Sequence, residues 1–344
     1  MTLAIQPLAG LRDAYGRVAR DLRVSLTDRC NLRCSYCMPA EGLAWLPGRT
    51  ILTDDEIIRL VRIAVERLGV DTIRFTGGEP LLRPGLAGII AAVRRLATAD
   101  GTPPGTALTT NGIGLDARID ELRAAGLQRV NISLDSLDRQ RYAALARRDR
   151  LPEVLAGLAA AEAAELRPVK VNTVVMRGVN EDDVLPLAEF CLERGYELRF
   201  IEQMPLGPRH GWDRSSMVPA EEVLGRLQQH YRLVPLPGRG AAPSEDWQVL
   251  DGDGRPRGRI GVIASVTRPF CGACDRTRLT ADGQVRNCLF ARTETDLRTP
   301  LRDGAGDLEL AELWQGAHLT KARGHGIDDP GFEQPERTMS SIGG

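Results

Sequence analysis

The chain has 344 residues, 42% of them hydrophobic and 26% charged, with a formal net charge of −1. This is ordinary for a soluble globular protein, and the length suits one large domain with an appendage. A general nucleic-acid binder would show a basic excess, which is missing here. No apolar run approaches the roughly 20 residues of a membrane span, and residues 1–20 lack the apolar core of a signal peptide. We therefore expect a cytoplasmic protein without membrane or nucleic-acid partners.

Short apolar runs alternate with amphipathic stretches through the first 200 or so residues. A capping box at 53–56 opens the first helix, which ends at Gly69. This alternation predicts a parallel α/β sheet of about six units, fewer than the eight of a closed TIM barrel. Periodicity alone does not separate a partial barrel from a doubly wound sheet. The expected strands are 22–26, 70–75, 106–110, 129–134, 168–176 and 197–201, and the expected helices 53–68, 86–96, 117–125, 139–146, 152–166 and 183–193.

Beyond this region the pattern changes. Residues 233–246 are rich in proline and glycine and suggest a linker. Turn signals at 251–254 and at Asp282-Gly283 predict hairpins, and residues 308–314 predict a helix before an extended end. We therefore expect a sheet domain over residues 1–235 and a hairpin-rich C-terminal domain over residues 236–344.

Three cysteines, Cys30, Cys34 and Cys37, directly follow the first expected strand with the spacing C-x3-C-x2-C. A structural zinc site normally has four protein ligands, and no fourth Cys or His lies nearby. Three thiolates can instead hold three irons of a cubane iron–sulfur cluster and leave the fourth iron open. The spacing therefore favours a cluster that binds a ligand from outside the protein.

A second trio, Cys271, Cys274 and Cys288, lies in the C-terminal region. It can hold a second cluster with an open iron, or a zinc ion if His318 or His325 supplies a fourth ligand. The seventh cysteine, residue 191, falls within an expected helix and suits a buried apolar position.

Basic residues recur at places that an α/β barrel would bring together. Arg276 and Arg278 share one face if their segment is extended, and guanidinium forks match phosphate oxygens. Lys170 in the fifth expected strand would need an anion if it points inward, although a solvated edge lysine is an open alternative. With Arg23 and Arg74 from the first two strands, these groups predict a polyanionic ligand such as a triphosphate.

The first cysteine loop, with Tyr36 before its last cysteine, resembles the signature of radical S-adenosylmethionine (SAM) enzymes. Residues 76–80, Thr-Gly-Gly-Glu-Pro, are similar to the motif by which that family binds the amino group of SAM. The resemblance implies a partial (βα)6 TIM-type barrel whose mouth is covered by the C-terminal domain. It also implies a [4Fe–4S] cluster whose open iron is chelated by SAM, and which cleaves SAM to a 5′-deoxyadenosyl radical when reduced.

Within that superfamily, the two cysteine trios, Asp-Arg-Thr-Arg at 275–278 and the terminal Gly343-Gly344 resemble the GTP 3′,8-cyclase family (MoaA) of molybdenum cofactor biosynthesis. Further matches lie at 22–29, 74–80, 170–172 and 199–202. The resemblance implies a lyase with two [4Fe–4S] clusters, SAM as cofactor and GTP as substrate. In the implied reaction the ribose 3′ hydrogen is abstracted and the carbon radical attacks C8 of guanine. The product radical would then be reduced and released as (8S)-3′,8-cyclo-7,8-dihydroguanosine 5′-triphosphate.

The same resemblance assigns roles to individual residues. The second cluster's open iron would bind the guanine base, and the Gly-Gly tail would insert near the substrate. Cyclic pyranopterin synthase (MoaC) would act next, flavodoxin or ferredoxin would supply electrons, and the oligomeric state stays open, a homodimer included. The implied catalytic residues are Arg23, Arg276 and Arg278; GTP contacts are Arg23, Arg74, Thr109, Lys170, Arg276, Thr277 and Arg278; SAM contacts are Tyr36, Gly78, Ser133 and Met204.

Two rival functions remain open at this point. A radical SAM enzyme that modifies peptides would also carry auxiliary clusters, but usually with more C-terminal cysteines than these three. A zinc-stabilised binding module, from a different class, would hold zinc and no iron.

Overall fold

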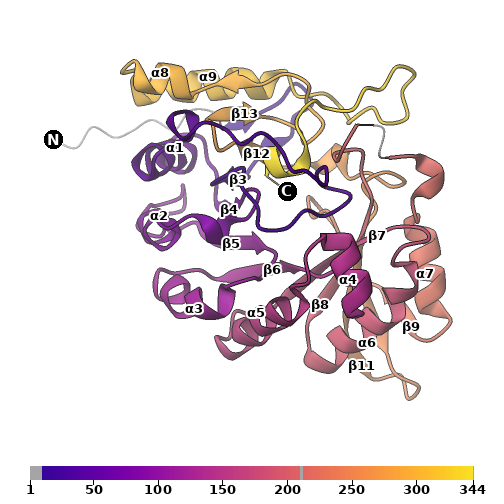
Figure 1. Ribbon diagram of the computed structural model, residues 1–344. Helices are drawn as coiled ribbons and strands as arrows, with labels where there is room; N and C mark the ends of the chain where they lie inside the picture. Colours follow the sequence, from indigo (N-terminus) through magenta and orange to yellow (C-terminus); the bar gives the residue numbers. More distant parts are fainter. Residues whose placement is uncertain (1–9, 210–211, 344) are drawn as a thin grey trace.

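The computed structural model describes residues 10–209 and 212–343 of the chain, and a twelve-stranded sheet dominates it (Figure 1). Its six central strands are parallel and follow one another in chain order. A doubly wound sheet would reverse its strand order at a switch point, so the partial-barrel prediction is confirmed. The strands are β3 (Asp21–Ser25), β4 (Thr72–Thr76), β5 (Gly105–Thr110), β6 (Arg129–Ser133), β7 (Lys170–Val175) and β8 (Glu197–Glu202).

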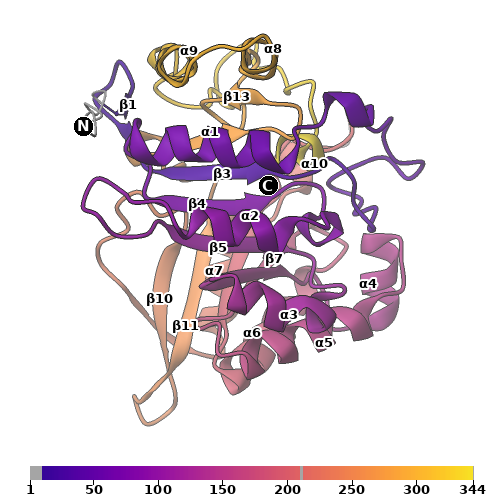
Figure 2. The ribbon, with the colours of Figure 1, turned by 90° about the vertical axis from the view of Figure 1, so that its left-hand side faces the viewer.

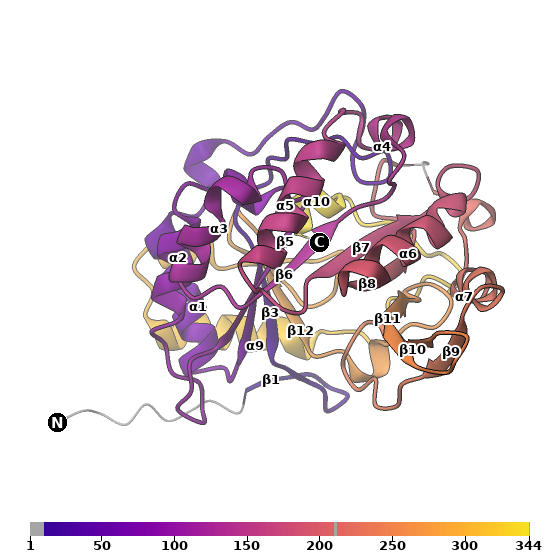
Figure 3. The same ribbon diagram turned by 90° about the horizontal axis from the view of Figure 1, so that it is seen from below.

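The helices between these strands lie along the outer face of the sheet, as Figures 2 and 3 show. The predicted capping box is present at the start of the first helix, where Thr53 and Glu56 satisfy each other's backbone N–H groups. Apolar residues of each helix pack on the sheet in one continuous core. The helices are α1 (Asp54–Glu66), α2 (Leu86–Val93), α3 (Leu115–Ala124), α4 (Arg139–Ala146), α5 (Leu151–Ala163), α6 (Val184–Arg194) and α7 (Ala220–Gln228).

The C-terminal region extends the sheet at both edges. Strand β11 (Pro256–Ile263) pairs in parallel with β8, and β12 (Arg276–Leu279) pairs in parallel with β3. The two predicted hairpin turns join β10 (Glu245–Leu250) to β11, and β12 to β13 (Gln284–Arg286). Strands of both expected domains thus share one sheet, and their division at residue 235 stays a prediction. The remaining strands are β1 (Leu11–Arg12), β2 (Val18–Ala19), β9 (Arg232–Pro235) and β14 (Thr295–Asp296).

Two expectations for the C-terminal region were wrong in detail. The segment 233–246, expected to be a linker, contains the end of β9 and the start of β10. Strand β9 lies at the edge of the sheet, where a proline can be accommodated because its missing N–H faces away from the neighbouring strand. The end of the chain is not extended throughout, because α10 forms one short turn beside the carboxyl ends of β3 and β4 (Figure 2). The C-terminal helices are α8 (Arg298–Arg302), α9 (Asp307–Leu319) and α10 (Met339–Ile342).

Short 3-10 helices connect these elements at Gly48–Thr50, Pro80–Leu82, Glu181–Asp183, Arg214–Ser216 and Cys271–Ala273. Among the residues that the structure describes, no helix combines the length and the apolar character needed to cross a bilayer.

Candidate active site

A cavity of about 560 Å³ occupies the inner side of the sheet and receives side chains from all six central strands. The C-terminal region closes it with residues 241–244, Asp246, Asp275, Arg276, Arg278 and residues 339–340. Thirteen of the seventeen predicted site residues line this one space, although their contacts with ligands stay predictions. The lining includes Arg23, Cys30, Cys34, Tyr36, Cys37, Arg74, Gly78, Thr109, Ser133, Lys170, Met204, Arg276 and Arg278.

The first cysteine loop is fixed by its backbone. The N–H groups of Arg33 and Ser35 donate to carbonyl oxygens at the end of α4, at 3.0 and 2.9 Å. The backbone turns tightly after Cys34, because the carbonyl of Cys34 accepts a hydrogen bond from the N–H of Cys37. This turn brings the thiols of Cys34 and Cys37 close to each other. All three thiols are free and face the cavity, with no disulfide to compete. This donor set fits three irons of a cubane and leaves the cavity side open to a further ligand.

Two glycines allow the loop after β4 to lie directly against the cysteine loop. A Cβ on Gly77 would stand 2.5 Å from the carbonyl oxygen of Thr27, and one on Gly78 would stand 2.3 Å from that of Arg29. The N–H of Gly78 instead donates to Thr27 at 2.7 Å. Close backbone approach is therefore what requires glycine here.

Buried polar pairs tie the cysteine loop to the ends of β5 and β6. The hydroxyl of Tyr36 donates to Asp135 at 2.7 Å, and Asn111 donates to the side chain of Asn31 at 2.6 Å. Burial raises the pKa of the Asp135 carboxyl to about 6 and that of Glu79 to about 7. Glu79 accepts from Thr110 and from two backbone N–H groups, so it connects β4 and β5 internally.

Three arginines form a row across neighbouring strands. Arg278 on β12 is in register with Arg23 on β3, which is in register with Arg74 on β4. Burial and the neighbouring guanidiniums of Arg278 and Arg276 lower the pKa of Arg23 well below its usual value. Guanidinium nitrogens of Arg23, Arg74 and Arg276 are buried without a hydrogen-bond partner, and Asp21 approaches Arg23 only to 4.0 Å. Like charges in register repel, so this row is built to receive an anion.

Lys170 extends the basic wall on the other side of the cavity. Lys170 points into the cavity, which agrees with the first of the two interpretations of its position, and it forms an ion pair with Glu197 of the neighbouring strand. Burial, followed by the charge of Arg199, lowers its pKa.

Thr277 is the exception among the predicted substrate contacts. Strand β12 is extended, so Arg276 and Arg278 face the cavity and Thr277 faces the other way. Its hydroxyl accepts a hydrogen bond from the indole N–H of Trp314 in α9 at 2.9 Å, and the residue is fully buried. The Thr277 side chain therefore does not line the cavity, and the predicted contact of this residue with GTP stays a prediction.

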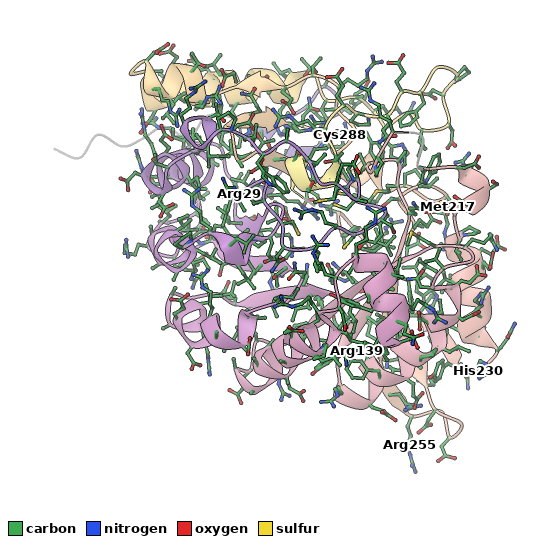
Figure 4. The ribbon with its side chains drawn as sticks, viewed as in Figure 1. Arg29, Arg139, Met217, His230, Arg255 and Cys288 are labelled. Carbon is green, nitrogen blue, oxygen red and sulfur yellow. The ribbon has the colours of Figure 1, made fainter. Side chains whose placement is uncertain are left out.

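The second cysteine trio lies just behind the cavity wall, since Phe270, Asp275 and Leu289, next to its members in sequence, line the cavity. Figure 4 labels Cys288 near the C-terminal helix, and its side chain packs on the small apolar cluster that includes Ile342. Burial alone would raise the pKa of Cys274, but the charges of Lys321 and Arg276 outweigh it and lower that pKa. All three thiols are free.

The zinc alternative fits this trio poorly. Within the described part of the chain, no three His, Cys, Asp or Glu side chains converge as the shell of a single ion requires. The ring of His325 is already engaged by the Ser265 carbonyl at 2.9 Å and by the N–H of Ile327 at 3.2 Å. His318 is buried in α9, where desolvation lowers its pKa to about 3. A cubane spreads its thiolates over three irons and does not need them to converge.

The C-terminal tail reaches the same cavity. The carbonyl oxygen of Gly343 accepts a 2.6 Å hydrogen bond from Arg278, and Ser340 contacts the thiol of Cys37. Gly343 has a φ of +88°, and a Cβ there would lie 3.0 Å from Ser25, so glycine is required. Gly344 lies outside the described residues. The tail is clamped upstream by Arg337, which donates to both oxygens of Asp282 at 2.9 and 2.8 Å.

Comparison with known proteins agrees with this geometry. The family model of the radical SAM superfamily matches residues 24–191, and the model described as Molybdenum Cofactor Synthesis C matches residues 196–327. The chain is therefore a radical SAM enzyme. The two models meet between residues 191 and 196, whereas the sequence-based boundary lies at 235.

Curated relatives show to which family of radical SAM enzymes the chain belongs. The GTP 3′,8-cyclase of Corynebacterium glutamicum (strain ATCC 13032) is 62% identical over 336 residues, which cover 97% of this chain and 89% of the relative. The GTP 3′,8-cyclase 2 of Mycobacterium tuberculosis (strain H37Rv) is 58% identical over 342 residues, covering 99% and 94%. The chain belongs to the GTP 3′,8-cyclase family of molybdenum cofactor biosynthesis. The cofactors of this family are SAM and two [4Fe–4S] clusters.

Solved structures bear on the fold alone. Streptococcus suis SuiB bound to S-adenosylmethionine has a TM-score of 0.55 at 12% identity and covers 87% of this chain and 68% of its own. SuiB bound to the precursor peptide SuiA has a TM-score of 0.59 at 13% identity, covering 86% and 64%. Identity this low does not transfer a peptide substrate, whereas the cyclase relatives match at far higher identity.

Several residues that line the cavity were not predicted from the sequence. Arg129 and Arg199 also line the cavity. Arg129 lies on the inward face of β6, and Arg199 lies on the inward face of β8. Extending the alternation argument used for Lys170 to every strand would have found them. Asp21, two residues before Arg23, follows from the same rule.

Proposed function

We propose that GTP binds in this cavity with its triphosphate on the row Arg278–Arg23–Arg74, flanked by Arg276 and Lys170. The unpartnered guanidinium nitrogens in that row are the observation that supports the proposal most strongly. Arginine forks bind phosphate oxygens in a bidentate manner, and burial strengthens each such contact. A triphosphate would supply the negative charge that Asp21 alone does not. Thr109 faces the same space, and the Thr277 side chain is left out of the site.

SAM is assigned to the opposite wall, beside the first cysteine trio. Tyr36, Gly78, Ser133 and Met204 line that part of the cavity. The Tyr36–Asp135 hydrogen bond keeps the tyrosine fixed, while the buried carboxyls of Asp135 and Glu79 suit a cofactor that carries an ammonium and a sulfonium. Cys30, Cys34 and Cys37 would hold the first [4Fe–4S] cluster.

The chemistry follows from placing the two ligands face to face. When bound and reduced, the first cluster supplies the electron that cleaves SAM and so provides the 5′-deoxyadenosyl radical. The arginines hold the triphosphate, which fixes where the ribose of GTP lies relative to that radical. Arg23, Arg276 and Arg278 are the residues we assign to catalysis, because they restrain the substrate while its 3′ hydrogen is removed and C8 is attacked. Cys271, Cys274 and Cys288 would hold the second cluster, toward which the guanine base would extend.

The wider assignment is the family's. The product, (8S)-3′,8-cyclo-7,8-dihydroguanosine 5′-triphosphate, would pass to cyclic pyranopterin synthase (MoaC). A low-potential donor such as flavodoxin or ferredoxin would reduce the clusters in the cytoplasm. Residues 1–235 would form the radical-generating part, and residues 236–344 the part that completes the substrate site.

The test is anaerobic reconstitution followed by iron and sulfide analysis and a single-turnover assay with SAM, GTP and dithionite. We expect about eight irons per chain, four for each cubane. 5′-Deoxyadenosine and cyclised GTP should then form together, and omitting GTP should remove the cyclised product. A protein with both clusters that cleaves SAM but leaves GTP unchanged would contradict the proposed function.

A further inference from the structure

Lysine is rare in this chain: only two of its 45 Lys and Arg residues are lysines, at positions 170 and 321. Both are buried or half-buried beside the same cavity or its wall. Lys170 has a carboxylate partner in Glu197. Nearly all basic residues of this chain are arginines, whose guanidinium differs from the compact ammonium group of lysine. Over the part of the chain that the structure describes, Lys321 has no such carboxylate partner, so its buried position needs a separate explanation.

Every N–H donor of the Lys321 ammonium group has an acceptor nearby. Its Nζ donates to the carbonyl oxygen of Arg276 at 2.9 Å, to the carbonyl oxygen of Cys274 at 3.4 Å and to the sulfur of Cys274 at 3.4 Å. An ammonium group has three N–H donors, and three acceptors are present. A guanidinium is larger and planar and does not present three donors from one atom.

Lys321 is only 4% exposed, so its charge is removed from water. In the ranges 10–209 and 212–343 none of the ion pairs includes it, in contrast to the other lysine. A buried cation without a counter-charge is strongly unfavourable. Of the three groups that it touches, two are neutral carbonyls, and only the sulfur of Cys274 can carry a negative charge. The carboxyl of Asp275 also interacts with the charge of Lys321, but no hydrogen bond or ion pair joins the two side chains among the described residues, and the positive charge of Arg276 acts on the same Cys274 thiol.

We propose that Lys321 is a positioning residue of the second cysteine site, donating a charged hydrogen bond to the Cys274 sulfur and raising the reduction potential of the cluster held there. A positive charge next to a ligand sulfur favours the more negative, reduced form of a cluster, because hydrogen bonds to the sulfurs and net charge set the potential. The proposal rests on the proposed function, which places a [4Fe–4S] cluster on Cys271, Cys274 and Cys288. It adds a residue outside the cysteine motif that controls that cluster.

Lys321 also joins two parts of the site. By holding the carbonyl of Arg276, it links the ligand Cys274 to strand β12, which carries the two cavity arginines. A purely structural role in supporting β12 would affect substrate binding but would not change a potential. The potential is therefore the discriminating readout.

The experiment is a potentiometric titration followed by EPR on full-length protein with both clusters loaded. SAM addition identifies the signal of the first cluster, which serves as an internal control. In Lys321→Met the second cluster should become at least tenfold harder to reduce, a shift of about 59 mV for one electron, while the first is unchanged. Lys321→Arg, which keeps the charge, should restore much of the shift. Arg323→Met, an exposed position in the same loop, is the matched control and should change neither cluster.

The outcomes separate the two proposals. If the wild-type protein binds only about four irons, the assignment of a second cluster fails, independently of Lys321. If both clusters load and the second potential is unchanged in Lys321→Met, the inference about Lys321 is wrong. Should Lys321→Met lose the second cluster, retention of about eight irons in Lys321→Arg supports a requirement for the charge. Loss of the cluster from both variants would show a packing role and overturn the inference.

Discussion

The two cysteine sites have the same number of thiols but different electrostatic surroundings. At the first, burial and then the carboxyls of Glu79 and Asp135 raise the pKa values of Cys30 and Cys34, and Glu79 acts on Cys30 more strongly than the guanidinium of Arg33 does. Burial raises the pKa of Cys30 to about 11 and that of Cys37 to about 12. At the second, the basic groups Lys321 and Arg276 lower the pKa of Cys274, whereas burial raises that of Cys271.

This difference teaches that ligand count alone does not define the role of a three-thiol site. The first trio opens into the cavity among carboxyl groups, which suits a ligand carrying positive charge. The second trio lies behind a wall of arginines and next to a buried ammonium, which suits a polyanionic substrate on the other side of that wall. This difference supports our proposal that the first cysteine site serves the cofactor and the second serves the substrate.

The largest effect should come from removing one ligand at each site in turn. Cys34→Ala should abolish SAM cleavage, because an incomplete first trio cannot hold a cluster that binds SAM. Cys288→Ala should keep 5′-deoxyadenosine formation and lose cyclised GTP. Both products are measured by chromatography after anaerobic turnover. If the Cys288 variant still cyclises GTP, the two sites do not divide their roles in this way.

Truncation of the tail should have the next largest effect, on the substrate side only. Without Gly343 and Gly344, Arg278 loses the acceptor that it holds at 2.6 Å, although both cysteine trios remain. We expect both clusters and SAM cleavage to persist while cyclisation is suppressed. The measurement is the ratio of 5′-deoxyadenosine to cyclised GTP in full-length and truncated protein. Equal ratios and rates would mean that the docked tail has no part in the reaction.

Much of the barrel could be predicted because its signals are local. The strand at residues 129–133 and the helix at 139–146 follow from apolar periodicity and from flanking turn residues within a few positions. The alternation that placed Lys170 inside also implied that Thr277 faces away from Arg276 and Arg278. The local rule placed the side chain of Thr277 correctly, whereas the contact with GTP that the family resemblance implies for this residue stays a prediction.

What could not be predicted depends on contacts between distant segments. Nothing near residue 278 indicates that it pairs with Arg23, more than 250 positions earlier, yet this register creates the arginine row. The docking of the tail depends in the same way on Asp282 and Leu206, which accept hydrogen bonds from Arg337 and from the N–H of Met339. The buried lysine at 321 gave one usable signal, its rarity in the composition.

The arginines of β12 should show an intermediate effect, confined to GTP. Each charged hydrogen bond to phosphate is worth roughly 1.5–3 kcal/mol, so Arg276→Ala or Arg278→Ala should reduce kcat/KM for GTP by about 10- to 150-fold. Iron content should not change. Arg255→Ala, in the exposed β10–β11 hairpin labelled in Figure 4, is the matched control. Wild-type cyclisation by both β12 variants would remove these arginines from the site.

Arg337 should have a smaller effect, because it acts on the tail and not on the substrate. Arg337→Ala removes the double contact with Asp282 and the ion pair with Glu294 at 2.9 Å, but Met339 and Ile342 still hold the tail. We expect docking to weaken by roughly 1.5 kcal/mol, the lower end of the range for a charged hydrogen bond. Hydrogen exchange of residues 338–343 should accelerate about tenfold, with a matching rise in uncoupled 5′-deoxyadenosine. Unchanged exchange would show that the clamp is redundant.

The smallest effect belongs to Cys191, the cysteine outside both trios. It is fully buried in α6 among core residues, and burial raises its pKa to about 12, as expected of an inert thiol. Cys191→Ala removes one sulfur atom from a packed core, so the free energy of unfolding should fall by about 1 kcal/mol. Iron content and both reactions should match the wild type, because neither site uses this thiol. Loss of iron from Cys191→Ala would mean that the assignment of three thiols to each site is incomplete.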